Sequence, residues 1–191
     1  MGYQGEIGGE MHKPLKFDRS TVLAMMEADL FPEGRKVEMI DGVLLEMSPA
    51  NNKHGVVLVD VIAALRPLLM RDMKGATDVA IFLDDRVMLA PDFAVLPKNI
   101  LTQDARGNDL LLAVEVADSS IERDLGLKAN LYSHYGVAEL WVVDIPGERL
   151  HVHREPASQG YGLISVHDWS ETLSPLALPD ANITLSEVIE L

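Results

Sequence analysis

Two acidic residues stand inside stretches of sequence that otherwise read as buried strand. Asp92 lies in APDFAVLP and Glu115 lies in LLLAVEVA, and all the other residues of these stretches are apolar. Ionised side chains are almost never fully buried unless they are paired or bind a metal. Divalent cations such as Mg²⁺ prefer oxygen ligands and are commonly held by one or two carboxylates. Two such acids on neighbouring strands therefore indicate a shared divalent-cation site.

A cation that could complete this site is Lys128, in the helical pattern DLGLKANLYSHYG. Asp124, Lys128 and Tyr132 are spaced by four residues and share one face of a helix. If the N-terminal half of this helix leans over the strand ends, the Lys128 ammonium can reach both carboxylates.

Structural roles are open for the same residues. Asp92 could cap a backbone amide at a strand end, and Glu115 could form a buried ion pair with an arginine. Lys128 could form an i,i+4 ion pair with Asp124 on the surface, which stabilises a helix only slightly. Tyr132 could serve packing alone. These alternatives differ in where the side chains point.

The elements that must position these residues follow from local patterns. Asp41-Gly42 is a strong signal for a two-residue hairpin turn within 36–49. Pro67 and Gly75 should kink and end the long helix. Helices are predicted at 18–29, 53–73 and 121–135, and strands at 78–85, 86–97, 110–117, 139–145, 149–155 and 161–167. The unit 110–117, 121–135, 138–145 is a βαβ candidate with parallel strands. We therefore expect an α/β or α+β fold with helices packed on a mixed sheet.

Composition limits the classes of protein that this chain can represent. The 191 residues include 48% apolar ones, which suits one domain over 18–191 after a frayed or disordered tail at 1–17. The absence of cysteine fits a reducing cytoplasm, and no apolar run is long enough for a membrane span. The net charge of −14 repels nucleic acid at long range, so a nucleic-acid interpretation needs local basic residues or metal ions.

The order and spacing of the motifs resemble the Uma2 family, long called the domain of unknown function 820. The resemblance rests on KVEMIDGVLLEMSP, His54, PDFAVLP, VEV and the pattern D-x-x-x-K-x-x-x-Y-x-x-x-G-V-x-E-x-W-x-V-D at 124–144. It runs from about residue 18 to the C-terminus. One departure is that family members usually continue VEV with Leu-Ser-Pro-Ser-Thr, whereas this chain has Ala-Asp-Ser-Ser at 117–120.

The resemblance implies a restriction-endonuclease-like fold of the PD-(D/E)xK superfamily, with a metal-dependent phosphodiesterase site. It implies that Asp92 and Glu115 bind the metal, and that the lysine of the motif has moved from the strand to the helix, at Lys128. Glu46 and His54 match positions that line the same pocket, with Glu46 available to complete the metal shell.

We therefore expect a Mg²⁺- or Mn²⁺-dependent endonuclease that cleaves nucleic acid, with DNA as the expected substrate. We also expect a homodimer, because many nucleases of this fold pair and the β-rich C-terminal half offers sheet edges. The alternative is a nuclease fold that no longer cleaves and acts as a binding or assembly module. The acidic surface favours this alternative, and the presence of Asp92, Glu115 and Lys128 together favours the enzyme.

Overall fold

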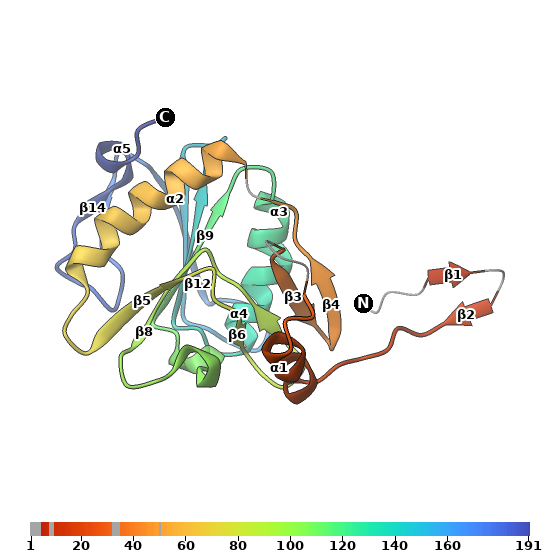
Figure 1. Ribbon diagram of the computed structural model, residues 1–191. Coiled ribbons are helices and arrows are strands. Elements are labelled where there is room, and N and C mark those ends of the chain that lie inside the picture. The colour runs from red at the N-terminus through yellow and green to blue at the C-terminus, as the bar shows by residue number, and fades with distance from the viewer. Residues whose placement is uncertain (1–4, 8–9, 32–34, 50) are drawn as a thin grey trace.

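A six-stranded mixed sheet forms the centre of the computed structural model, which describes residues 5–7, 10–31, 35–49 and 51–191 (Figure 1). The strand order is β12-β11-β10-β9-β8-β5. The strands are Met73–Thr77 (β5), Phe93–Pro97 (β8), Leu112–Ala117 (β9), Glu139–Asp144 (β10), Arg149–Arg154 (β11) and Leu163–Asp168 (β12). With helices flanking this sheet, the α+β class predicted from the sequence is confirmed.

The predicted βαβ unit is present. β9 and β10 are parallel neighbours, with Leu140 paired to Ala113 and Asp144 to Ala117. All other neighbours in this sheet are antiparallel, including β8 against β9. The two segments that carry the embedded acids therefore lie side by side.

Helices cover both faces of the sheet. On one face α2 (Asn52–Leu65) and α5 (Leu185–Val188) pack over the strands, and α2 buries Val57, Val61 and Leu65. The opposite face carries three consecutive helical pieces, and Tyr132, in the last of them, is buried. These pieces are α3 (Ile121–Arg123), the π-helical turn η4 (Asp124–Lys128) and α4 (Ala129–His134). Figure 1 shows the sheet between α2 and the α3–α4 column.

A smaller four-stranded sheet, in the order β4-β3-β7-β6, stands beside the main one. Its first hairpin turns at Asp41 and Gly42, which both have positive φ, as the predicted turn requires. α1 (Arg19–Glu27), which Asp18 caps, contributes Val22 to the core of this part. The strands are Val37–Ile40 (β3), Val43–Glu46 (β4), Ile81–Phe82 (β6) and Met88–Leu89 (β7).

Two predicted elements are wrong in extent. The helix predicted over 53–73 ends at Leu65. The 3₁₀ turn η1 (Arg66–Leu68), which contains Pro67, follows it, and Met73–Thr77 forms strand β5. Gly75 lies inside that strand, where a Cβ atom would collide with the Phe93 ring. Its role is close packing between strands and not a helix stop.

The apolar run predicted as a single strand over 86–97 divides in two. β7 joins the smaller sheet and β8 joins the larger one, and the chain crosses between them at 90–92. Asp92 therefore lies where the two sheets meet. The sequence did not indicate this division, because the residues on both sides of it are equally apolar.

The remaining elements are short. They are η2 (Thr102–Asp104), η3 (Gly107–Asp109), β13 (Thr172–Leu173) and β14 (Ile183–Thr184). Of the predicted tail at 1–17, residues 1–4 and 8–9 lie outside the described residues, and Gly5–Ile7 (β1) pairs antiparallel with Glu10–His12 (β2). Within the described part of the chain, no helix has the length and apolar character to cross a membrane.

Candidate active site

Asp92 directly precedes β8, and Glu115 lies in the neighbouring strand β9. The ladder between the two strands ends at the pair Phe93–Val114, one residue from each of these acids. Both are buried, at 6% and 3% exposure. The backbone N–H of Val116 donates to Asp92 Oδ2 over 2.8 Å. Asp92 thus accepts a backbone amide, as its structural alternative requires, but it has further partners.

Lys36 and His54 hold Asp92 in its charged form. Lys36 Nζ lies 3.0 Å from Oδ1, and His54 Nε2 lies 3.1 Å from Oδ2. Burial alone would raise the pKa of Asp92, but the hydrogen bond from His54, the charge of Lys36 and the Val116 amide hold it well below its usual value. Asp92 is therefore ionised at neutral pH.

Glu115 has a different electrostatic environment. The Tyr132 hydroxyl donates to Glu115 Oε1 over 2.6 Å, and Lys128 Nζ lies 2.7 Å from the same oxygen. Burial raises the pKa of Glu115 to about 7; the charge of Lys128 opposes this shift and the charge of Asp92 adds to it. Glu115 therefore gains or loses a proton near neutral pH.

The Lys128 ammonium is buried among three carboxylates. Besides its contact with Glu115, Nζ lies 3.2 Å from Glu38 Oε1 and 3.8 Å from Asp124 Oδ1, and Lys128 is only 3% exposed. Burial alone would lower the pKa of Lys128, but the charges of Glu115, Glu38 and Asp124 raise it above its usual value. A surface ion pair with Asp124 alone does not describe this lysine.

The helical segment that supplies Lys128 contains a π turn. In the regular α-helix predicted for 121–135, Asp124, Lys128 and Tyr132 share a face. The structure inserts η4 over the first two of these residues, and all three are buried. The Ser120 hydroxyl donates to Asp124 Oδ2 over 2.5 Å at the start of this segment. π turns inside helices are frequent at functional sites.

Glu38 is the acid that the sequence analysis missed. It lies in β3 with 0% exposure, and Arg123 Nη2 is 2.5 Å from its Oε2. The stretch KVEMIDG places it between two apolar residues, so the signal that identified Asp92 and Glu115 was also present here. Lys36, Arg123 and the exposed Asp78 carry no comparable signal, because single charges in loops and helices are common.

The structure does not bring the predicted residue Glu46 to this cluster. Glu46 is half-exposed and forms a surface ion pair with Arg35. In the β3–β4 hairpin Glu46 pairs with Val37, whereas Glu38 pairs with Leu45. Since successive strand residues alternate in direction, Glu38 and Glu46 project from opposite faces of the hairpin.

His54 does reach the cluster, from the first turn of α2. The Asn51 side chain caps this helix by accepting the His54 N–H over 2.9 Å. Asn51 Nδ2 also donates to Asp118 Oδ2 over 2.5 Å, which ties the start of α2 to the turn after β9. The hydrogen bond to Asp92 raises the pKa of His54, and burial opposes it.

The assembled cluster holds more carboxylates than lysine and arginine side chains. The acids are Glu38, Asp78, Asp92, Glu115 and Asp124, and the basic residues are Lys36, Arg123 and Lys128. Among the described residues, no three His, Cys, Asp or Glu side chains form a ready-made metal-binding group. Without the exposed Asp78, the four buried acids still outnumber the three lysine and arginine side chains, and this excess fits a divalent cation, which would neutralise it.

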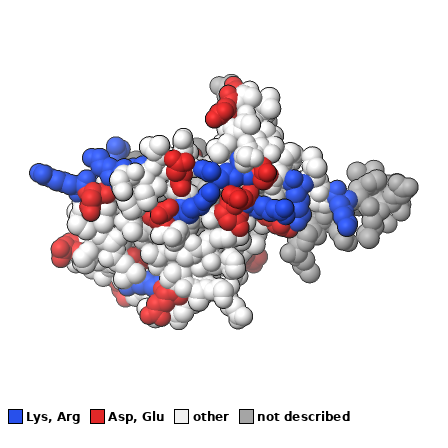
Figure 2. Space-filling model, turned by 90° about the horizontal axis from the view of Figure 1, so that it is seen from below, with Lys and Arg blue, Asp and Glu red and all other residues white. Residues whose placement is uncertain are grey.

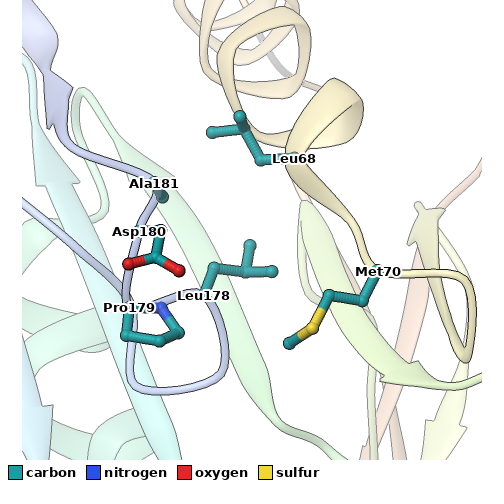
Figure 3. A pocket seen from close by; sticks show the side chains of 6 residues that line it. All are labelled: Leu68, Met70, Leu178, Pro179, Asp180 and Ala181. Carbon is teal, nitrogen blue, oxygen red and sulfur yellow. The ribbon is translucent and has the colours of Figure 1, made fainter.

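A pocket elsewhere on the molecule is unrelated to this cluster (Figure 3). It lies at the other end of α2, whose 14 residues span about 21 Å at the usual helical rise. Its walls are apolar except for one carboxylate. The lining residues are Leu68, Met70, Leu178, Pro179, Asp180 and Ala181.

A mixed sheet that presents acids from neighbouring strands, with a lysine from the covering helix beside them, defines a nuclease-like fold. The chain belongs to the Uma2 family, whose model carries the description "Putative restriction endonuclease" and matches residues 22–186. The family expected from the motifs is therefore confirmed, and it supports a nuclease-like, hydrolytic function on nucleic acid.

A solved structure supports the same fold. The crystal structure described as "a putative nuclease belonging to DUF820" from Anabaena variabilis superposes with a TM-score of 0.69 over 92% of this chain and 98% of that chain. The two sequences are 13% identical, so this likeness shows the fold alone. Among curated proteins, no match was found.

Proposed function

We propose that this protein is a Mg²⁺- or Mn²⁺-dependent endonuclease that hydrolyses phosphodiester bonds in DNA. One observation carries the proposal: Asp92 is buried and accepts the amide of Val116, the residue after the buried Glu115, inside a cluster whose four buried carboxylates outnumber its three lysine and arginine side chains. An excess of negative charge costs free energy in a buried site unless a cation neutralises it.

In this proposal Asp92 and Glu115 would provide the oxygen ligands, and the buried Glu38, which shares Lys128 with Glu115, replaces Glu46 as the third acid of the cluster. A divalent cation bound there would lower the pKa of a water molecule and polarise the scissile phosphate. Lys128 would hold Glu115 in place through its 2.7 Å contact and would offset negative charge at the site without touching the phosphate. His54 fixes Asp92 through its Nε2.

A second candidate function is a nuclease fold that binds without cleaving. The net charge of −14 favours it. On the face shown in Figure 2, Lys and Arg side chains are interspersed with Asp and Glu, so this face does not attract DNA as a basic groove would.

A Mn²⁺ titration distinguishes the two candidates. We expect calorimetry to detect binding to the wild-type protein and Mn²⁺ to raise its melting temperature by mass action. Asp92→Asn should lose most of both effects, and the matched variant Glu46→Gln, which removes an exposed acid outside the cluster, should keep them. Absence of Mn²⁺ binding to the wild-type protein at millimolar concentration would favour the binding module.

A further inference from the structure

Lys36 lies on the solvent side of the carboxylate cluster, directly before β3. Its Nζ is 3.0 Å from Asp92 Oδ1 and 3.0 Å from Asp78 Oδ1. The Lys36 side chain is 30% exposed, whereas that of Lys128 is 4% exposed. Of these two lysines, Lys36 is the one whose ammonium a molecule arriving from solvent can reach.

The contact between Lys36 and Asp78 contributes little to the stability of the cluster. The Asp78 side chain is 62% exposed, so it needs no buried partner, and an exposed ion pair contributes little to stability. Asp92 already receives the Val116 amide and His54 on its other oxygen. Lys36 therefore holds a positive charge on the exposed side of the cluster, in contact with an exposed acid.

The chemistry of an ammonium group suits a phosphate ligand. Lysine is a compact point charge with three N–H donors, and Lys36 directs two of them at carboxylates. Among the described residues Lys36 Nζ has no third hydrogen-bond partner, so one donor is available for an oxygen on the solvent side. A phosphodiester that approaches Asp92 meets an excess of negative charge, and a cation beside Asp92 offsets that repulsion.

We propose that Lys36 is a substrate-contacting residue that binds a backbone phosphate of DNA and places the strand against Asp92. This inference rests on the proposed function, because it takes DNA as the substrate. It assigns to Lys36 a role that Lys128, enclosed by Glu115, Glu38 and Asp124, cannot perform from its buried position.

The test is equilibrium binding of a labelled random-sequence DNA duplex in Ca²⁺ across a range of salt concentrations. Lys36→Met should weaken binding several-fold, and the slope of log K against log[salt] should decrease in magnitude by about 1, the loss of one phosphate contact. Lys36→Arg should restore the slope. The matched control Lys98→Met removes an exposed lysine beyond the opposite end of β8 and should bind like the wild-type protein.

Asp78→Asn gives a second test that does not depend on the stability of Lys36→Met. Freeing Lys36 from Asp78 should tighten DNA binding, and this gain should disappear in the double variant with Lys36→Met. Wild-type affinity and salt slope in Lys36→Met, or an equal gain from Asp78→Asn with and without Lys36, would overturn the inference. Absence of DNA binding by the wild-type protein would overturn it as well.

Failure of the inference and failure of the proposed function remain distinguishable. A wild-type protein that cleaves DNA, alongside a Lys36→Met variant that binds and cleaves equally well, refutes only the role of Lys36. A wild-type protein that does not cleave, but binds DNA with a Lys36-dependent salt slope, refutes hydrolysis and keeps the phosphate contact.

Discussion

Glu139 and Glu115 are buried carboxylates on neighbouring strands, with different surroundings. Glu139 accepts hydrogen bonds from Trp141 Nε1, from Arg154 and from the backbone N–H of Leu176, so one cation and neutral donors satisfy both of its oxygens. Glu115 instead shares one lysine with two other acids. An acid inside an apolar run therefore predicts burial and a partner, but only the surrounding charges separate a structural acid from a candidate ligand.

In the absence of metal, neutralising Asp92 and neutralising Glu115 should change the free energy of unfolding in opposite directions. The pKa of Asp92 is lowered, so its charge stabilises the native state above its unfolded pKa, and Asp92→Asn should cost about 1–3 kcal/mol at neutral pH. The pKa of Glu115 is raised from 4.5 to about 7, so the native state binds this proton more tightly than the unfolded state does. The stability that the bound proton contributes is lost as pH rises through that range.

Glu115→Gln should therefore gain stability relative to the wild-type protein as pH rises from about 5 to about 8. Urea unfolding of all three proteins at both pH values measures these differences. If Glu115→Gln lost as much stability as Asp92→Asn at the higher pH, the assignment of a raised pKa to Glu115 would be wrong.

Lys128 should matter for stability as well as for cleavage. In a surface ion pair with Asp124, the alternative that the sequence left open, Lys128 would contribute little to stability, but the structure encloses its ammonium among three carboxylates. Removing one partner from a buried ion pair costs about 3–5 kcal/mol, so we expect Lys128→Met to unfold at much lower urea concentration.

Added Mn²⁺ should restore part of that stability to Lys128→Met, because a divalent cation replaces the lost positive charge. The double variant Lys128→Met/Glu115→Gln, with one buried acid fewer, should also recover part of the loss. Unfolding midpoints with and without Mn²⁺ provide the measurement. A loss below about 1 kcal/mol would instead match a surface ion pair.

At the scale of elements, local signals predicted the hairpin at Asp41-Gly42, the helix at 18–29 and the βαβ unit. Each depends on residues near one another in the chain. β5 and the division of 86–97 were missed because they depend on distant contacts, such as the Phe93 ring against Gly75. The same limit applies to the site. The spacing of the motifs predicted that Asp92 and Glu115 belong to one site. Only the geometry of the β3–β4 hairpin shows that Glu38, and not Glu46, belongs to the cluster.

Two glycines around the α3–α4 segment test this arrangement of elements. A Cβ atom on Gly126, inside η4, would meet no other atom within 4 Å, so Gly126→Ala should stabilise the protein by about 0.5–1 kcal/mol. A Cβ atom on Gly107 would overlap the Tyr135 backbone at the end of α4, so Gly107→Ala should destabilise. Thermal unfolding compares the two variants. Similar changes in both would show that α4 does not pack as described.

At the scale of the whole molecule, β12 offers a surface for the expected homodimer. It ends the strand order of the main sheet, and Ile164 and Val166 on it are 56% and 54% exposed. Unprotected sheet edges pair readily with other chains, and a charged side chain on the edge opposes this. We predict a dimer in light-scattering measurements, which Ile164→Lys converts to monomer.

Val59→Lys is the matched control for the dimer, because Val59 is equally exposed and apolar but lies on α2, away from that edge. It should leave the oligomeric state unchanged. A monomeric wild-type protein, or an Ile164→Lys variant that remains dimeric, would exclude pairing through β12.

Nicking of supercoiled plasmid in Mn²⁺ at low salt tests the central claim most directly, since low salt exposes any effect of the acidic surface. The wild-type protein and Glu46→Gln should nick the plasmid at similar rates, because Glu46 lies outside the cluster. Asp92→Asn should be slower by about two to three orders of magnitude, the usual effect of removing one essential charged group. Equal rates for wild type and Asp92→Asn, or no nicking by the wild-type protein, would contradict the account.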